Sequence, residues 1–322
     1  MTKIESGPMS SDYHDLVQAV FSKNISGHFY RGYTILPIEE PSPIHGSLEM
    51  ISENRSVWFI CTGMGCQWTS MASELMSFPV FAKSLQECAK IMIPFGVDLI
   101  DVITRNDKTI FENIINCFIG ITAIQIGLVD LLLALGIVYD GIIGHSLGET
   151  CCAYADGCFT KEQAMMCSYF RGKSSIDAPV SNGLMVAIGA NYKELRDLPP
   201  TVVVGCRNSS TSCTLSGLAE DVTSYCNKLK ERNIFHKIVS TGNRAYHSQY
   251  IVEAGKQFKQ DFQRFVPYPK MRSSKWISSS VPEELWSTEL ARYSSAEYHY
   301  NNFVNTVLFD AACSHIPEML SS

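Results

Sequence analysis

The segment GIIGHSLGETCCAYADG, at residues 141–157, constrains the fold of this chain more than any other. It contains a short apolar stretch, a glycine-framed turn around Ser146 and a helical pattern that stops near Gly157. The spacing G-x-S-x-G between a strand and a helix is that of a nucleophile elbow. A Cβ at either flanking glycine would clash, because the turn brings strand, serine and helix close together. We therefore predict an α/β fold that presents the Ser146 hydroxyl at the edge of a sheet.

The chemistry expected at this turn is attack by Ser146 on a carbonyl carbon. The following helix and the backbone N–H of Leu147 would stabilise the negative charge that develops on the attacked oxygen. One such donor contributes about 2.7–4 kcal/mol in acyl-transfer enzymes. A free serine hydroxyl is a poor nucleophile, so the site also needs a base.

Eight histidines compete for the role of base. His145 is adjacent to the serine, so on a sharp turn its side chain should point away from the hydroxyl. His247 follows a strand pattern and the turn TGNRAY, from which a loop can return to Ser146. The remaining candidates lie in weakly patterned or strand-like segments: His14, His28, His45, His236, His299 and His315. The residues alone leave His247 as one candidate among several.

Arg171 is the third residue of chemical interest, in the apolar run MMCSYFRG of the next helical pattern. A single arginine in such a run is either a surface residue whose stem covers apolar neighbours or a buried partner for an anion. The sequence leaves both interpretations open.

Four regions follow one another along the chain. The first is weakly patterned and broken by prolines, as in a linker, and VWFICTGMG then begins a strand that runs into a glycine turn. Helical patterns cover 71–91, 109–135 and 160–177. Further on, GLMVAIG, NYKELRDL, TVVVGCRNSS, SCTLSG, DVTSYCNKLKERN and FHKIVST give the order β-α-β-β-α-β of a ferredoxin-like unit. We expect a linker region, a large subdomain, an inserted small subdomain and a return to the large subdomain at 1–54, 55–182, 183–246 and 247–322.

Composition argues against several other classes of protein. A net charge of −6 without a basic run does not suit nucleic-acid binding. The twelve cysteines form no Cys-x-x-Cys pair, so we expect reduced thiols, no metal site and a cytoplasmic location. Residues 117–138 are long enough for a membrane span, but Gln125 and Asp130 near their middle favour a buried core helix. The first fifteen residues lack the apolar core of a secretion signal.

The ordered segments VWFICTGMGCQW, TAIQIGLVDLL, GIIGHSLGE, YADGC, YFRG and AYHS resemble the malonyl/acetyltransferase domain of animal-type fatty acid synthase. The resemblance runs from about Val57 to the last residues. Before it, SDYHDL and FYRGYTIL resemble the end of the linker that joins the ketosynthase to this transferase. The resemblance implies an α/β-hydrolase-like large subdomain with a parallel sheet and the ferredoxin-like insertion.

The same resemblance implies a ping-pong reaction of fatty acid biosynthesis. Ser146 would take an acyl group from malonyl- or acetyl-coenzyme A with His247 as base, and the phosphopantetheine thiol of an acyl carrier protein would accept it. Met64 and Leu147 would supply the oxyanion hole, and Arg171 would pair with the malonyl carboxylate. Phe118 and Tyr246 match positions that line the acyl pocket. Three positions of the small subdomain match those that meet coenzyme A or acyl chains: Thr211, Ser212 and Phe235. The implied domain binds no cofactor of its own.

Three features of the sequence depart from the family pattern. Tyr246 stands where phenylalanine is usual, and Thr306 stands where proline is usual. The family also continues beyond the position of Ser322, so we expect the end of the large subdomain to be missing.

Two alternative functions stay open. A serine hydrolase or thioesterase would share the elbow, but it expects an acid between the serine and a histidine near the chain end. The second alternative is a truncated, non-catalytic paralogue that acts as a binding module.

Overall fold

A computed structural model describes residues 15, 16, 19, 30–35, 45–50, 56–179 and 181–317. The chain divides into two compact units, Met1–Arg55 and Ser56–Ser322. In the first unit, strands β1 (Tyr30–Ile35) and β2 (His45–Met50) pair antiparallel. Most of the linker predicted at 1–54 lies outside the described residues.

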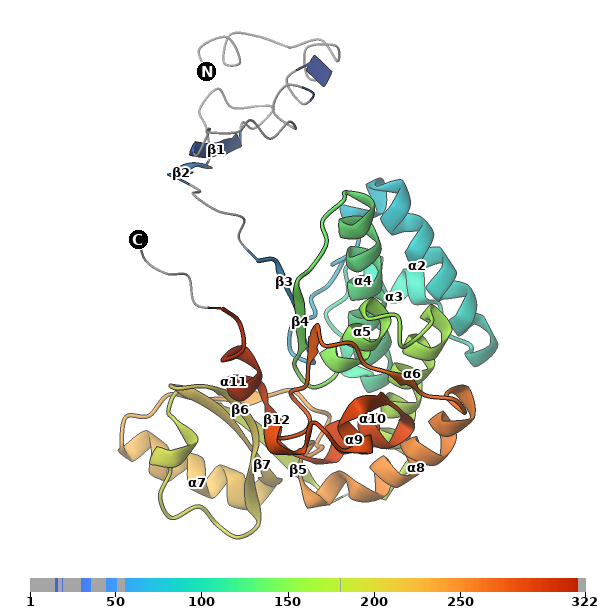
Figure 1. Cartoon of the computed structure of the whole chain (residues 1–322). Coiled ribbons are helices and arrows are strands. Elements are labelled where there is room, and N and C mark those ends of the chain that lie inside the picture. The colour runs from blue at the N-terminus through green and yellow to red at the C-terminus, as the bar shows by residue number, and fades with distance from the viewer. Residues whose placement is uncertain are drawn as a thin grey trace. The chain divides into compact units, whose positions relative to one another are not determined.

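A three-stranded parallel sheet carries the elbow in the second unit (Figure 1). Its order is β10 (Trp276–Ile277), β4 (Gly141–Gly144) and β3 (Trp58–Cys61). The central strand β4 is buried along its whole length, as expected for a parallel sheet covered on both faces. Helix α5 (Gly148–Ala155) begins directly after the elbow and packs on β3 and β4. The α/β fold expected from the elbow is confirmed.

Helices α2 (Pro79–Met92), α4 (Ile114–Ala134) and α6 (Lys161–Asp177) pack against one another beside this sheet (Figure 1). By length and composition α4 could cross a membrane, but 61% of its most apolar window is buried inside the protein. The Asp130 carboxylate on α4 accepts hydrogen bonds from Ser84 and Tyr154, at 2.6 and 2.5 Å, and pairs with Lys161. These partners explain how a charged residue is accommodated on a core helix.

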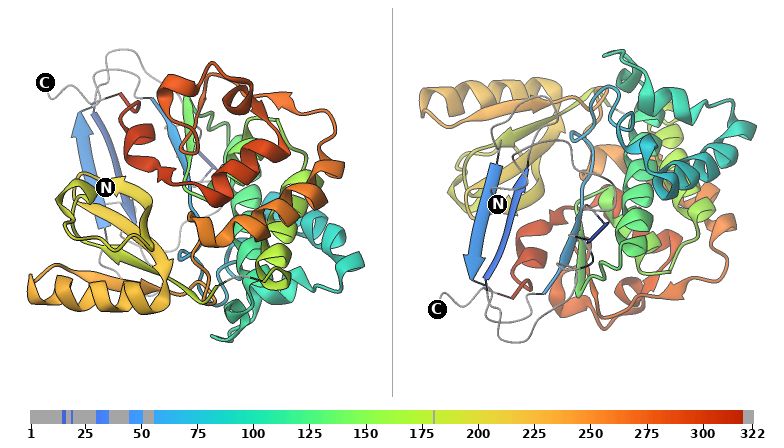
Figure 2. Two further views of the ribbon diagram at one scale, coloured as in Figure 1. Left: turned by 90° about the horizontal axis from the view of Figure 1, so that it is seen from below. Right: turned by 90° about the horizontal axis from the view of Figure 1, so that it is seen from above.

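The small subdomain contains a five-stranded sheet in the order β12-β6-β7-β5-β8. Its last four strands have the neighbour order of a ferredoxin-like unit, and helix α7 packs on one face of the sheet (Figure 2). The elements are β5 (Gly183–Ile188), β6 (Val202–Ser209), β7 (Ser212–Leu218), α7 (Ala219–Glu231) and β8 (His236–Val239).

One predicted element of this unit is wrong. The helix expected over NYKELRDL is a single 3₁₀ turn, Tyr192–Glu194. Leu195 is extended, Asp197 has a left-handed φ of 56°, and Pro199 and Pro200 follow. The prolines cannot donate the backbone hydrogen bonds that would continue a helix, so the crossover stays short.

The C-terminal region crosses between the two subdomains. After α8 (Val252–Phe262) and α10 (Ala296–Val304), the strand β12 (Val307–Leu308) pairs in parallel with β6. The Thr306 hydroxyl donates to the carbonyl of Val204 at 2.9 Å, next to this pairing. A proline at position 306 could not make this bond, because it has no side-chain hydroxyl. The other elements of this region are β9 (Lys270–Met271), α9 (Glu289–Arg292), β11 (Tyr293–Ser294) and α11 (Phe309–Cys313). Helix α3 (Leu99–Thr104) lies earlier in the chain, between α2 and α4.

All twelve cysteines are unpaired, and ten of them are buried. The ten buried cysteines therefore act as small core residues.

Candidate active site

The elbow has the close packing that its glycines predict. Ser146 has a left-handed φ of 53°, which turns its side chain out between β4 and α5. A Cβ on Gly144 would lie 2.4 Å from the backbone nitrogen of Glu149, and a Cβ on Gly148 would lie 2.1 Å from the carbonyl oxygen of Cys61. Neither position can therefore hold a side chain without moving the backbone.

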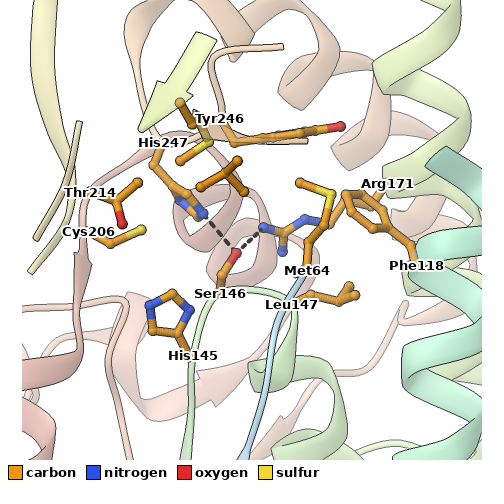
Figure 3. Close-up of a pocket in the computed structure, with 12 residues that line it drawn as sticks. Met64, Phe118, His145, Ser146, Leu147, Arg171, Cys206, Thr214, Tyr246 and His247 are labelled. Carbon is orange, nitrogen blue, oxygen red and sulfur yellow. Dashed lines mark hydrogen bonds between the residues drawn. The ribbon is translucent and has the colours of Figure 1, made fainter. Parts of the chain in front are cut away.

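His247 is the histidine that the fold brings to Ser146 (Figure 3). The Ser146 hydroxyl lies 2.7 Å from His247 Nε2. On the other side of the ring, Nδ1 donates to the backbone carbonyl of Asn305 at 2.9 Å. This second bond fixes the tautomer, so the lone pair of Nε2 faces the serine. A backbone carbonyl takes the place that a carboxylate has in a Ser-His-Asp triad.

The site keeps His247 neutral. Burial lowers the pKa of His247 to about 3, and the positive charge of Arg171 and the nearby ring of His145 act in the same direction. At neutral pH the imidazole is therefore a free base that can accept the serine proton. His145 itself turns to the small subdomain, where its Nε2 lies 2.9 Å from the side-chain oxygen of Asn208.

Arg171 is buried, which decides between the two interpretations that the sequence left open. Its side chain is 1% exposed, and no carboxylate of the described residues lies within ion-pair distance of it. Nη2 donates to Ser146 Oγ at 3.2 Å, and Nη1 donates to the side-chain oxygen of Asn302 at 2.6 Å. Burial lowers the pKa of Arg171 to about 10, so the guanidinium remains protonated at neutral pH.

Met64 and Leu147, the two residues expected to form the oxyanion hole, both line the cavity at Ser146. The Gln125 side chain accepts from Thr62 N at 2.7 Å and donates to Thr62 O at 3.1 Å, which fixes the loop before Met64. A Cβ on Gly63 would lie 3.5 Å from the nitrogen of Leu147, so the loop lies directly on the elbow. Within the described part of the chain, no group accepts from either N–H. Both donors are free for an oxyanion.

A cavity of about 90 Å³ opens above Ser146 (Figure 3). Besides the residues already named, Phe118 and Tyr246 line it, with ring centroids 5.8 Å apart. The three other residues assigned through the resemblance do not line it. Phe235 is 66% exposed before β8, whereas Thr211 and Ser212 lie at the turn between β6 and β7. The two residues predicted for the acyl pocket, Phe118 and Tyr246, thus line the cavity, whereas the three positions matched to contacts with coenzyme A or acyl chains lie outside it.

A larger groove of about 650 Å³ adjoins this cavity. It shares Met64, His145 and Val239 with the cavity and continues along Gly65 and Lys237. The groove runs between the loop 62–67 of the large subdomain and strand β8 of the small one. It gives an extended group access to Ser146.

The sequence analysis missed the polar residues that support the site. The Glu149 carboxylate is fully buried and accepts from Trp276 Nε1 at 2.6 Å and from Tyr298 at 2.8 Å. It also accepts from the backbone and hydroxyl of Ser279, both at 2.7 Å. Asn302 is 1% exposed within the segment NNFVNTVLF. The available signal was the run of polar residues on the short helix α10, whose buried face includes Asn302.

Residues 58–321 match the sequence model of the acyl transferase domain family. A reducing polyketide synthase of Gibberella moniliformis is 31% identical over an alignment of 274 positions, which covers 81% of this chain and 11% of that protein. A highly reducing polyketide synthase of Penicillium crustosum is 29% identical over an alignment of 329 positions, which covers 94% of this chain and 13% of that protein. The chain thus spans a small part of either relative. These relatives are polyketide synthases, so they do not support the narrower resemblance to animal-type fatty acid synthase.

Two solved structures share the fold. The acyltransferase domain of the polyketide synthase PpsC of Mycobacterium tuberculosis superposes with a TM-score of 0.73 at 24% identity, covering 81% of this chain and 79% of that chain. The malonyl CoA-acyl carrier protein transacylase of Coxiella burnetii gives 0.70 at 19% identity, covering 81% and 83%. The fold class predicted from the sequence is therefore confirmed. With the family match over 58–321, this shows that the chain belongs to the acyl transferase domain family.

Proposed function

We propose that this chain transfers malonyl and acetyl groups from coenzyme A, through an ester on Ser146, to the phosphopantetheine thiol of an acyl carrier protein. The observation that carries the proposal is the convergence of three groups in one cavity. These are the Ser146 hydroxyl, the neutral His247 ring at 2.7 Å and the buried Arg171 guanidinium at 3.2 Å.

The first half-reaction follows from this geometry. As Ser146 Oγ attacks the thioester carbonyl, its proton passes to His247 Nε2, and the carbonyl oxygen becomes an oxyanion held by the N–H groups of Met64 and Leu147. The C–S bond then breaks, and the leaving sulfur takes the proton from His247. The products are free coenzyme A and the acyl ester of Ser146, and His247 is neutral again.

The second half-reaction is the reverse with a new thiol. The carrier thiol gives its proton to His247 and attacks the ester carbonyl, and Ser146 regains the proton as its C–O bond breaks. The groove of about 650 Å³ beside Met64 and Lys237 would admit the phosphopantetheine arm. Water in place of the thiol would give the thioesterase reaction, the rival that the sequence left open.

Arg171 gives the site a preference for a dicarboxylic acyl group. The distal carboxylate of a malonyl group would approach a buried cation that has only neutral partners. A planar guanidinium can donate two parallel hydrogen bonds to a carboxylate, which lysine cannot do. An acetyl group would leave this cation unpaired and bind more weakly.

The whole protein is proposed to be a multidomain synthase in which this domain loads a carrier domain beside a ketosynthase. The named relatives are reducing polyketide synthases, which favours polyketide over fatty acid synthesis. The Coxiella burnetii protein, named as a malonyl CoA-acyl carrier protein transacylase, supports malonyl and a carrier protein as the reactants.

The test is the intact mass of the chain after incubation with malonyl-coenzyme A. We expect a malonyl adduct on the unsubstituted chain and none on the Ser146→Ala variant. An adduct that persists in Ser146→Ala would reject Ser146 as the nucleophile. No adduct on a folded, unsubstituted chain would support the non-catalytic alternative, and an adduct lost to water faster than to a carrier thiol would support the thioesterase.

A further inference from the structure

Arg171 is held by an amide where a carboxylate would be expected. A buried charge is costly unless it is paired, and buried arginines therefore usually have a carboxylate partner. Arg171 instead donates to the neutral side chain of Asn302, which is itself 1% exposed. The Nε of Arg171 is buried and has no hydrogen-bond partner among the described residues. The positive charge is thus left without a counter-ion in the unliganded protein.

The orientation of the Asn302 amide is fixed from its other side. Its Nδ2 donates to the hydroxyl oxygen of Ser280 at 2.8 Å, so its Oδ1 must face Arg171. The loop that carries Ser280 is tied to the elbow helix, because Ser279 donates twice to Glu149. The amide therefore positions the guanidinium at Ser146 without neutralising it.

The buried acid Glu149 does not act as a counter-ion of Arg171. Glu149 acts on Arg171 only through space, since its oxygens accept hydrogen bonds from Trp276, Ser279 and Tyr298. The rings of Phe303 and Phe118 lie 4.7 and 5.9 Å from the Arg171 guanidinium carbon. They offer π faces to the cation but no negative charge that would compete with a carboxylate.

We infer that Asn302 is a specificity-determining residue, which selects dicarboxylic acyl groups by holding Arg171 in place while leaving its charge for the substrate. This inference rests on the proposed function. An aspartate at position 302 would have nearly the same shape and could accept from both Arg171 and the Ser280 hydroxyl. It would, however, give Arg171 a permanent counter-ion and so compete with the malonyl carboxylate.

The experiment compares acylation of Ser146 by malonyl- and acetyl-coenzyme A in the Asn302→Asp variant. We expect kcat/KM for malonyl loading to fall about 10- to 100-fold, the value of a hydrogen-bonded charge pair. Acetyl loading should fall much less, and an acetyl ester on Ser146 also shows that the variant is folded. Equal losses for both donors would mean that Asn302 is only structural, and no loss for either would mean that the charge at position 302 is irrelevant. Both results would overturn the inference.

Two further variants separate charge from shape. Asn302→Leu keeps the volume but adds no charge, so the malonyl-to-acetyl ratio should stay well above that of Asn302→Asp, even if both rates fall. A collapse of the ratio in Asn302→Leu would overturn the inference, also where Asn302→Asp fails to fold. Asn301→Asp adds the same charge one residue away. It loses the hydrogen bond that Asn301 Nδ2 donates to the Ser280 carbonyl, so both rates can fall, but the malonyl-to-acetyl ratio should stay that of the unsubstituted chain.

The proposed function and this inference fail differently. An unsubstituted chain that forms no malonyl ester would overturn both. A normal malonyl ester on that chain, with the same donor ratio in Asn302→Asp, would overturn the role of Asn302 alone.

Discussion

At the scale of single residues, the site depends on two side chains whose charge states are set by burial. His247 is neutral because its buried position disfavours the imidazolium, and Arg171 beside it adds to that effect. Arg171 stays charged although it is buried, because an ordinary arginine is so strongly basic that the lowered pKa remains far above neutrality. A neutral base and a permanent cation therefore coexist next to one hydroxyl.

The rate of Ser146 acylation should be nearly independent of pH from about pH 8 down to about pH 5. Protonation of His247 would abolish the base, but its pKa lies at about 3 instead of the usual 6.5. Single-turnover loading of malonyl-coenzyme A, measured by quenched intact mass, would reveal the profile. A drop in rate centred near pH 6.5 would show that the histidine is accessible to solvent in the working enzyme.

Arg171→Ala should lower malonyl loading about 10- to 100-fold more than acetyl loading, because only the malonyl group loses a charged hydrogen bond. Both rates can fall in part, since Nη2 also donates to Ser146. Arg171→Lys is the matched control, which keeps the charge and loses the planar pair of donors. Equal loading losses for the two donors in Arg171→Ala would make the arginine a structural residue.

At the scale of elements, contacts made by the first residues of α5 stabilise the elbow. Gly148 lies against the end of β3, and Glu149 connects α5 to β10 and α10 through Trp276 and Tyr298. These contacts explain why a strand, a turn and a helix can hold Ser146 in a left-handed conformation. A loop with no such support would relax that backbone.

Gly148→Ala should be far more destabilising than Gly157→Ala. The new Cβ at 148 would lie 2.1 Å from the Cys61 carbonyl oxygen, whereas a Cβ at 157 meets nothing within 4 Å. Gly157 has a φ of 73°, so its replacement carries only the backbone penalty of about 1–2 kcal/mol. Urea unfolding of both variants measures the contrast. Similar free energies of unfolding for the two variants would show that the start of α5 can move away from the end of β3 at little energetic cost.

At the scale of the whole molecule, the two subdomains are held together by the C-terminal region. This region supplies Asn302 to Arg171 from α10 and the Asn305 carbonyl to His247, and then adds β12 to the sheet of the small subdomain. The ion pair of Arg207 with Asp310, at 3.0 Å, secures α11 beside that sheet. The active site is therefore complete only when segments distant in sequence have assembled.

Stability at acidic pH should depend on His299, which is fully buried in an aromatic cluster with Phe159 and Trp276. Burial lowers the pKa of His299 to about 3. The unfolded chain binds a proton near pH 6.5 that the folded chain does not, so stability is lost as the pH falls below 6.5. Between pH 7 and pH 5 this loss is about 2 kcal/mol, and His299→Phe should remove it. Urea unfolding of both proteins at the two pH values would test this, and equal pH dependence would contradict it.

The sequence by itself determined the elbow, the parallel sheet and most of the inserted subdomain, because these depend on local spacing of glycines and apolar residues. It could not determine the first crossover of the small subdomain, where two prolines override a helical pattern. Nor could it select His247 from eight histidines without a family resemblance, since 101 residues separate that ring from Ser146.

Only the tertiary structure decided that Arg171 is buried, that Asn302 faces it and that Asn305 orients the base. Those contacts join residues 131 and 58 positions apart, for which no local pattern exists. The tertiary structure also kept Phe118 and Tyr246 at the cavity while leaving Thr211, Ser212 and Phe235 outside it. Local spacing fixes which residues a turn can hold, whereas the charge states and side-chain partners at the site arise from burial among distant segments.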